Sequence, residues 1–414
     1  METKKLIDCC EFISDGDHLP PPKSDSGVPF ITISNITGQN KLSFEDTMFV
    51  PESYYNGLNE NKKAQKGDIL YSVVGSFGKP VYVDFDKQMV FQRHIAILRP
   101  KRNVNARFIY YTMLNPQFYK LVDKLAIGCS QRTVTLDTLR NIEVNLPDKD
   151  IQDKMVGILS LIDEKIDINN NVNDNLEQQA KLLYDYWFTQ FDFPDESGKP
   201  YRSSGGKMVW NEQLKRNIPE NWAVVSLSTV FNFKSGFPFS SDLYVTKGRY
   251  KLLTIKNVQD NGINLDVDNH INDIPSNVPD YCFLKADDIL MSLTGNVGRI
   301  GIMYDEGCLL NQRVALAKPV KEDLNSFVYF LLKSDMIRKQ YETIANGSSQ
   351  KNLSPVEAEN VLIAYNEQVA NHFASFANKY LKTIVSNLLE NESLIHLRDW
   401  LLPMLMNGQA TIPD

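Results

Sequence analysis

KGDILYSVVGSFGK, at residues 66–79, returns as ADDILMSLTGNVGR at residues 286–299, and this repetition decides the fold. Two further pairs of segments repeat at nearly the same offset of about 220 residues, FQR at 91–93 with NQR at 311–313 and AIGCSQR at 126–132 with ANGSSQK at 345–351. A period of this length is too long for a solenoid. The chain is therefore expected to contain two copies of one domain, with a function that it carries out twice.

Length and composition are those of an ordinary globular protein with more than one domain. A chain of 414 residues is too long for a single hydrophobic core, and 43% apolar and 23% charged residues are typical values. No apolar run approaches the ~20 residues of a membrane span, and the polar start METKK does not resemble a secretory signal. The five cysteines form neither a disulfide framework nor a zinc motif. We therefore expect a protein of the reducing cytoplasm without membrane contact.

The charge is unevenly distributed along the chain. The net charge of −7 by itself argues against a nucleic-acid partner. Much of this deficit falls in residues 148–193, where 10 acidic side chains stand against 4 basic ones. The composition therefore leaves room for a basic patch on either copy, although bulk charge does not demonstrate one.

Within each copy, short strands precede helices. β-Branched runs interrupted by Gly and Pro predict a mixed sheet, and apolar residues at helical spacing predict the helices. Strands are expected at 29–36, 95–98, 252–258 and 314–317, and helices at 106–121 and 326–341.

A long helix is predicted after each copy, because residues that suit a helix seam recur every three or four positions. The seams consist of Met155, Ile158, Ile162, Ile166, Asn169, Asn173, Leu176, Ala180, Leu183 and Trp187, and of Phe373, Phe376, Tyr380, Ile384, Asn387, Asn391, Leu394, Arg398, Leu401 and Leu405. About 40 residues in each helix would form a rod of roughly 60 Å.

Two asparagines occur at the same depth in each seam. One interpretation is that they are surface residues of two unrelated amphipathic helices. The other interpretation pairs the helices antiparallel, which places Asn169 near Asn391 and Asn173 near Asn387. Buried Asn layers lower stability but fix the register of a coiled coil. A fixed register would also fix the distance between the two globular copies.

Pro, Gly and Ser mark a linker between the first long helix and the second copy. Part of the linker region is expected to dock, because Met208, Val209, Trp210 and Trp222 are costly to leave in water. The predicted boundaries are 1–147 for the first copy, 148–193 for the first long helix, 194–221 for the linker, 222–366 for the second copy and 367–408 for the second long helix.

The sequence contains no convincing catalytic constellation. Phosphate-binding loops, nucleophile elbows and the catalytic tetrapeptide of methyltransferases are absent. Asp148 followed by Asp163 and Lys165 loosely matches a nuclease metal site, but Asp163 in this position is more typical of a solvated helix face. We therefore predict no catalytic residue and no metal ligand, which leaves molecular recognition as the function.

Two copies at a fixed separation suit duplex DNA, whose helical repeat rewards a fixed spacing of the contacts. Residues kept between the copies would grip phosphates or serve the fold, whereas residues that differ are free to read different bases. The matched pairs are Lys79 with Arg299, Arg93 with Arg313, Gln131 with Gln350 and Arg132 with Lys351. The divergent segments supply Lys23, Asn40, Lys41, Asn61, Lys62 and Lys63, and Ser240, Ser241, Lys247, Arg249, Lys251 and Asn261. For each of these residues, an ordinary surface position or an internal salt bridge is an equally good interpretation, and the Ser130–Gln131 and Ser349–Gln350 loops could cap a neighbouring element instead.

The chain resembles the specificity subunit of type I restriction-modification enzymes over its whole length. The resemblance rests on the paired segments at 66–79 and 286–299, the Gly-x-Ser-Gln-Arg/Lys loops, the linker with FPDESGKP at 193–200 and SSGGK at 203–207, and the ending LLPMLMNG at 401–408. It implies an α+β fold in which two target-recognition domains, each a mixed β-sheet with short helices, are separated by two long antiparallel coiled-coil helices in a pseudo-two-fold arrangement.

The same resemblance implies a non-catalytic subunit that reads a split DNA sequence, one half per domain, with the helices setting the gap. Two modification subunits would methylate adenine, and restriction subunits would translocate and cut DNA. S-adenosylmethionine, ATP and Mg would bind to those partners and not to this chain. The aromatic helix ends at 184–188 and 400–402 would either dock the modification subunits or pack on a neighbouring copy. The alternative function is a coiled-coil adaptor that scaffolds other proteins without DNA.

Overall fold

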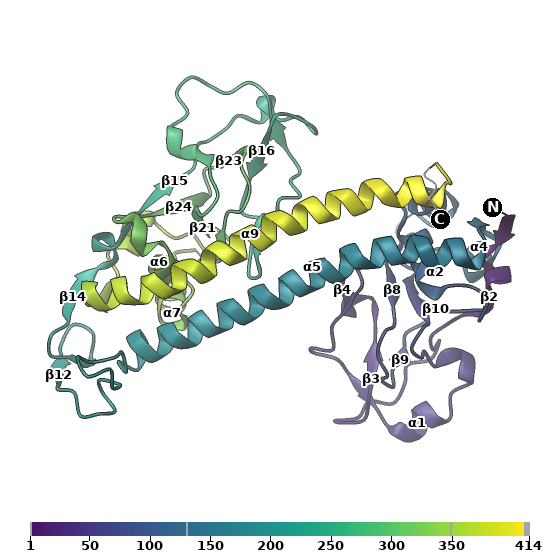
Figure 1. The fold of residues 1–414 in the computed structure, drawn as a ribbon, viewed down its shortest axis with the longest axis horizontal. Coiled ribbons are helices and arrows are strands. Elements are labelled where there is room, and N and C mark those ends of the chain that lie inside the picture. The colour runs from purple at the N-terminus through teal and green to yellow at the C-terminus, as the bar shows by residue number, and fades with distance from the viewer. Residues whose placement is uncertain (1, 130, 348–349, 410–414) are drawn as a thin grey trace. The chain divides into compact units, whose positions relative to one another are not determined.

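The computed structural model describes residues 2–129, 131–347 and 350–409. It divides into two compact units, residues 1–165 with 393–414 and residues 166–392. Each unit combines one of the repeated domains with a stretch of each long helix (Figure 1). No described helix is both long enough and apolar enough to cross a membrane.

The first copy, from β1 to β11, is built around a four-stranded antiparallel sheet. Its strands occur in the order β2 (Cys10–Asp15), β10 (Ile95–Pro100), β7 (Ile69–Ser72) and β8 (Pro80–Tyr82). A smaller sheet contains β6 (Phe49–Val50), β3 (Val28–Ile31) and β9 (Val90–Phe91), with β3 and β9 parallel. Two-stranded pairs join β4 (Ile36–Gly38) to β5 (Lys41–Leu42) and β1 (Glu2–Lys5) to β11 (Glu143–Leu146).

The second copy, from β14 to β25, repeats this plan. Its main sheet has the order β15 (Phe231–Ser235), β24 (Val314–Pro319), β21 (Ile289–Ser292) and β22 (Ile300–Ile302). The smaller sheet contains β19 (His270–Ile271), β16 (Tyr250–Leu253), β23 (Cys308–Leu310) and β20 (Phe283–Leu284), and the pairs are β17 (Val258–Gln259) with β18 (Gly262–Ile263) and β14 (Ala223–Ser226) with β25 (Leu362–Tyr365). The duplication that was predicted from the sequence is confirmed by the matching order of the main sheets, although the smaller sheet has three strands in the first copy and four in the second.

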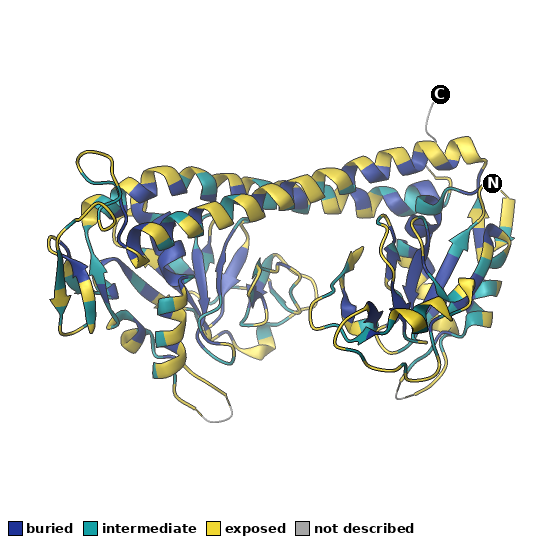
Figure 2. Cartoon of the chain, turned by 90° about the horizontal axis from the view of Figure 1, so that it is seen from below, coloured by how far each residue is buried: buried dark blue, intermediate teal, exposed yellow. Residues whose placement is uncertain are grey.

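The main sheet of each copy is buried on both faces, because alternate residues of a strand point to opposite sides. In the first copy, Ile69 and Tyr71 of β7 face the core that contains the helices, whereas Leu70 faces the smaller sheet. Ile289 and Leu290 of β21 divide in the same way in the second copy. Figure 2 shows the buried residues concentrated along these strands.

The short helices depart from the prediction at one point in each copy. The helix expected at 106–121 is two helices, α2 (Ala106–Leu114) and α3 (Pro116–Leu125), and the helix expected at 326–341 is α6 (Asn325–Leu332) and α7 (Asp335–Ile344). Asn115 ends α2 and caps α3 by accepting a hydrogen bond from the Gln117 amide at 2.9 Å. Ser334 caps α7. Cap residues followed by Pro116 or Asp335 explain both breaks. The copies also contain α1 (Glu52–Asn56), α4 (Leu136–Asn141) and α8 (Pro355–Glu359).

The strands predicted at 29–36 and 252–258 are also shorter than expected. β3 ends at Ile31 and β16 ends at Leu253, and a turn follows each. Asn35 Oδ1 accepts from the Thr32 amide at 2.8 Å, and Asn257 Oδ1 accepts from the Thr254 amide at 2.9 Å. The same Thr-x-x-Asn turn therefore closes both strands.

The long helices are α5 (Lys149–Tyr184) and α9 (Glu367–Met406), and α5 continues into a π-helical turn at Asp185–Thr189. Within residues 166–392 they pack antiparallel. Asn169 Nδ2 donates to Asn391 Oδ1 at 2.9 Å, and Asn387 Nδ2 donates to Asn173 Oδ1 at 2.8 Å. The predicted pairing of the asparagines is confirmed, and their role in fixing the register stays a prediction.

Three packing predictions were wrong. Ile158 and Phe376 were placed on the seams, but they are 37% and 45% exposed, and the neighbouring Leu159 and Ala377 are buried instead. Trp210 was expected to dock and is 56% exposed. It lies on the hairpin of β12 (Met208–Asn211) and β13 (Arg216–Pro219), whose Met208 and Val209 do pack on the core. The aromatic end of α5 also packs on its own unit, because Tyr184, Trp187 and Phe188 belong to that core.

Candidate nucleic-acid interface

In each copy, the repeated glycine-rich segment forms a loop that meets a second loop. The first loop follows β7 or β21, and the second follows α3 or α7. The Gly75 amide donates to the Arg132 carbonyl at 2.9 Å, and the Gly295 amide donates to the Lys351 carbonyl at 2.8 Å. The Gln131 and Gln350 Nε2 atoms lie equally close to these glycines, 3.8 Å from the position of an added Cβ. Both copies therefore present the same pair of joined loops.

Serine and glycine shape the first loop. The Ser72 hydroxyl donates to the Ser76 carbonyl and accepts from the Lys79 amide, both at 3.0 Å. Ser292 makes the equivalent contacts with Asn296 and Arg299. Gly75 has φ +68° and Gly295 has φ +77°, a left-handed conformation that favours glycine. The repetition in the sequence thus records a backbone turn, and it confirms that Lys79 and Arg299 are equivalent.

A second feature common to both copies is a close backbone contact. It joins the residue that follows β2 or β15 to the segment that precedes β10 or β24. A Cβ on Gly16 would lie 2.1 Å from the Phe91 carbonyl oxygen, and one on Gly236 would lie 2.2 Å from the Asn311 carbonyl oxygen. Only glycine tolerates such an approach. The residues after each glycine are consequently held against residues 91–95 in the first copy and against 310–314 in the second.

The hydrogen bonds of this second feature correct one predicted match. Val73 donates to the His94 carbonyl, whereas the equivalent Leu293 donates to the Arg313 carbonyl. In the sheet, Ile95 pairs with Ser72 and Val314 pairs with Ser292. Arg313 therefore corresponds to His94, and Arg93 corresponds to Gln312. The sequence match of Arg93 with Arg313 was wrong by one residue, because the second copy is one residue shorter between β22 and β23.

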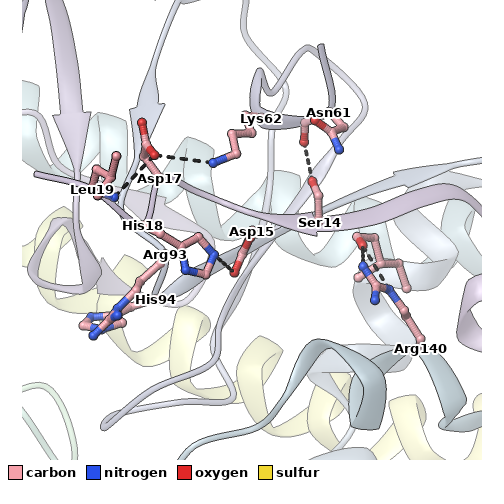
Figure 3. A network of polar contacts seen from close by, with 11 residues as sticks. Ser14, Asp15, Asp17, His18, Leu19, Asn61, Lys62, Arg93, His94 and Arg140 are labelled. Carbon is pink, nitrogen blue, oxygen red and sulfur yellow. Dashed lines mark hydrogen bonds and ion pairs between the residues drawn. The ribbon is translucent and has the colours of Figure 1, made fainter. Parts of the chain in front are cut away.

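At this place in the first copy, His18, Arg93 and His94 lie close together (Figure 3), and they line a groove. Two adjoining cavities, of about 420 and 280 Å³, share His18, Arg93 and His94 in their lining. His18 Nε2 contacts Asp15 Oδ2 at 2.8 Å, and Arg93 Nε donates to His94 Nε2 at 3.4 Å. Burial and the nearby Arg93 lower the pKa of His94, so neutral imidazole is favoured. Gln131 of the joined loops lines the smaller cavity.

The type I restriction modification DNA specificity domain matches residues 1–178 and 219–390, which include both copies. The chain belongs to this family. The specificity subunit of the type I restriction enzyme HindI from Haemophilus influenzae is 22% identical over 403 residues, with 84% of this chain and 87% of that protein covered. The MjaIX specificity subunit from Methanocaldococcus jannaschii is 21% identical over 320 residues, with 76% and 71% covered. A solved type I S subunit from M. genitalium shares the fold with a TM-score of 0.57 and 18% identity, covering 100% of this chain and 96% of that one.

Membership of the family makes this chain a DNA-specificity subunit of a type I restriction-modification system. The coiled-coil adaptor without DNA is not favoured. The two copies are hereafter called the first and second specificity domains.

Most of the residues predicted to contact DNA are exposed. These are Lys23, Asn40, Lys41, Asn61, Lys79, Arg93 and Gln131 in the first specificity domain, and Ser240, Ser241, Lys247, Arg249, Asn261, Arg313, Gln350 and Lys351 in the second. Asn40 also has a structural role, because its Oδ1 accepts from the Tyr82 amide at 2.7 Å and its φ is +51°. Ser130, Ser348 and Ser349 lie outside the described residues.

Several predicted cations already have acidic partners inside the chain. Lys62 lies 3.4 Å from Asp17, Lys63 lies 2.8 Å from Glu60, and Arg299 lies 2.9 Å from Asp260. Arg132 pairs with Asp123. Lys251 has two acidic partners, since it contacts Asp305 at 3.3 Å and Glu392 of α9 at 2.9 Å. These contacts assign Lys251 at least a structural role, in which it ties β16 to α9.

The nuclease-like pattern has a structural explanation. Asp163 accepts from Tyr111 Oη at 2.7 Å and from Arg398 Nη1 at 3.0 Å. The Arg398 side chain is only 7% exposed, so Asp163 balances a buried charge and is not a solvated helix residue. Within the described parts of the chain, no group of three or more His, Cys, Asp or Glu side chains could hold a metal ion.

Sequence reasoning missed His18, His94 and the glycine that holds them together. Gly16 and Gly236 are separated by the same offset as the repeated segments, and this was the available signal. The positions equivalent to His18 and His94 hold Pro238 and Arg313, and this difference did not distinguish the two histidines from the many other residues that differ between the copies.

Proposed function

We propose that this subunit reads a split DNA sequence, one half with each specificity domain. The observation that carries the proposal is a backbone frame that occurs twice and presents different side chains. The joined loops and the glycine contacts recur between the domains, whereas residues 17–18 and 93–94 differ from their counterparts 237–238 and 312–313. A shared frame suits a shared phosphate grip, and differing side chains suit different bases.

The long helices set the unread gap between the half-sequences. Asn169 and Asn173 pair with Asn391 and Asn387 between the long helices, and polar pairs of this kind penalise any shift of one helix along the other. Deleting seven residues, or two helical turns, from both helices would change the gap and leave each half-sequence unaltered. Methylation mapping that returned an unaltered gap would refute this role.

The subunit itself performs no catalysis and positions its partners. Two modification subunits bind S-adenosylmethionine and methylate adenine, and restriction subunits use ATP and Mg to translocate and cut the DNA. This chain holds none of these cofactors, and the complex acts in the cytoplasm, where host DNA lies. The second domain carries 16 acidic and 14 basic residues between 221 and 364, so the partners supply many of the phosphate contacts.

A domain exchange tests the proposal directly. Residues 1–147 are replaced by the first domain of another family member, and the chimaera is expressed with the modification subunit. Genome-wide mapping of methylated adenine should return a new first half-sequence and the original second half and gap. A chimaera that changes both halves, or a wild-type complex that methylates no split sequence, overturns the proposal. A gel shift with and without the modification subunit measures how much of the DNA affinity belongs to this chain.

A further inference from the structure

We propose that His18, Arg93 and His94 read bases of the first half-sequence, with Arg93 specifying a guanine. The proposal rests on the proposed function and identifies the part of the first specificity domain that distinguishes one sequence from another. It reverses the expectation that Arg93 is a phosphate contact shared by both domains.

The backbone brings the three side chains together and fixes their position. The Asp17 amide donates to the Phe91 carbonyl at 2.6 Å, and the Arg93 amide donates back to the Asp17 carbonyl at 3.0 Å. Gly16 lies too close to this strand to carry a side chain. These backbone contacts join the segment of His18 to the segment of Arg93 and His94 in one surface. The three side chains project from that surface next to one another (Figure 3). A surface fixed by its backbone is what base reading requires, because misplaced donors lose specificity.

Internal contacts orient these side chains but leave hydrogen-bonding groups available for DNA. The His18 side chain is 60% exposed and is held by Asp15 at 2.8 Å. Arg93 uses Nε for His94, and within the described residues neither of its Nη atoms has a hydrogen-bond partner. The outer fork of a guanidinium matches O6 and N7 of guanine in the major groove, and this is the commonest specific contact between protein and DNA. All three side chains line both cavities of the groove, so they stand where the two cavities meet.

The second specificity domain shows that this surface varies while the frame is constant. At the equivalent positions, Arg93 is replaced by Gln312 and His94 by Arg313, and both replacements are exposed. Asp17 and His18 are replaced by Phe237 and Pro238. By contrast, Gln131 is retained as Gln350, and Lys79 is retained as a cation in Arg299. A phosphate contact common to both domains would not be exchanged for glutamine, whereas an arginine and a glutamine at one reading position suit guanine and adenine.

The decisive experiment uses the complete complex with its modification subunit. Arg93→Gln removes the fork, and Arg93→Lys keeps the positive charge but loses the bidentate geometry. The matched control is Arg102→Gln, the same change at an exposed arginine beyond the opposite end of β10. Genome-wide mapping of methylated adenine reports both half-sequences and the gap in one measurement, and competition gel shifts with single-base variants measure discrimination.

The expected result is a local loss of specificity. Both Arg93 variants should lose preference at one guanine of the first half-sequence, roughly tenfold or more in competition, which is the usual size of a bidentate base contact. The second half-sequence, the gap and the Arg102→Gln control should be unchanged. An Arg93→Lys complex that keeps the wild-type preference, or a uniform loss of affinity for every sequence, overturns the proposal in favour of a phosphate contact.

The same data separate this proposal from the proposed function. If wild-type methylation follows no split sequence, the proposed function fails. If wild-type methylation is split and Arg93→Gln leaves the first half-sequence intact, only the assignment of Arg93 fails. If Arg93→Gln abolishes all methylation, a triple replacement of Gln92, Arg93 and His94 by the Asn-Gln-Arg of the second domain decides, because that sequence already occupies the same backbone frame. A triple variant that methylates the original first half-sequence, or none, counts against the proposal.

Discussion

The two specificity domains have a carboxylate at the same place, but it is buried in the first domain and only half-buried in the second. In the first domain, Asp68 accepts two hydrogen bonds from Arg99, at 2.9 and 2.8 Å, and the guanidinium also lies over Phe12, 4.7 Å from the ring centre. In the second domain, Lys318 replaces Arg99 and is exposed. The equivalent Asp288 accepts from the Lys285 amide at 2.8 Å, as Asp68 accepts from the Gln65 amide at 2.9 Å.

This difference shows what the duplicated frame needs and what it does not. The contact from carboxylate to backbone is present in both domains, so it belongs to the turn that leads into β7 and β21. The ion pair is present only in the first domain. In the second, a cavity of about 620 Å³ lined by Asp288 and Lys318 adjoins the carboxylate. The turn therefore forms without Arg99. Removing the positive charge at this strand position, Arg99 in the first domain and Lys318 in the second, should lower the stability of the two domains by different amounts.

The largest expected effect follows from breaking the pair in the first domain. Arg99→Leu leaves Asp68, whose side chain is 1% exposed, as a buried charge without its partner, and this should cost about 3–5 kcal/mol of stability. The measurement is amide hydrogen exchange during urea unfolding, which reports β7 and β21 separately. Lys318→Leu is the matched control and should change the protection of β21 by only about 0.5 kcal/mol. Equal losses in both domains would show that the comparison is wrong.

The sequence predicted those parts of the structure that depend on periodic or repeated residues. The duplication, the antiparallel helices and the Asn169–Asn391 contact were all predicted, because each one leaves a pattern at a fixed spacing. Helix faces were less certain, since Ile158 and Leu159 are equally apolar and only the packing decides which is buried.

The candidate site was predicted less well, because it depends on register. The second domain has one residue fewer between β22 and β23, so Arg313 is the structural equivalent of His94 and not of Arg93. An alignment of short segments cannot detect that shift. The ion pairs of Lys251 join residues far apart in the sequence, so its exposure could not be judged either. Which residues face DNA is determined by backbone contacts such as that of Gly16, and composition does not report them.

A smaller effect is expected when the ion pair of the first domain is introduced into the second domain. Lys318→Arg introduces the guanidinium of the first domain beside Asp288, where the equivalent strand position and the adjoining cavity provide room for it. A charge-assisted pair of this kind should stabilise the second domain by about 1–2 kcal/mol. It should also lower the pKa of Asp288, as determined by carboxyl-carbon NMR. Arg99→Lys is the reciprocal control and should destabilise the first domain, while a Lys318→Arg variant with an unchanged pKa of Asp288 would contradict the prediction.

The smallest effect concerns the pH dependence of the second domain. Burial raises the pKa of Asp288 above its ordinary value of 3.8, so the folded state binds this proton more tightly than the unfolded chain does. The cost of the buried charge is therefore absent below the unfolded pKa and is fully present above the folded pKa, and stability falls as the pH rises between them. Asp288→Asn removes this dependence and should stabilise β21 at pH 7, but not at pH 3, by about 1 kcal/mol. Asp323→Asn, at an exposed carboxylate lining the same cavity, should show no such difference between the two pH values. Hydrogen exchange at both pH values makes the comparison, and stabilisation of equal size at pH 3 would show that the amide acts through packing and not through charge.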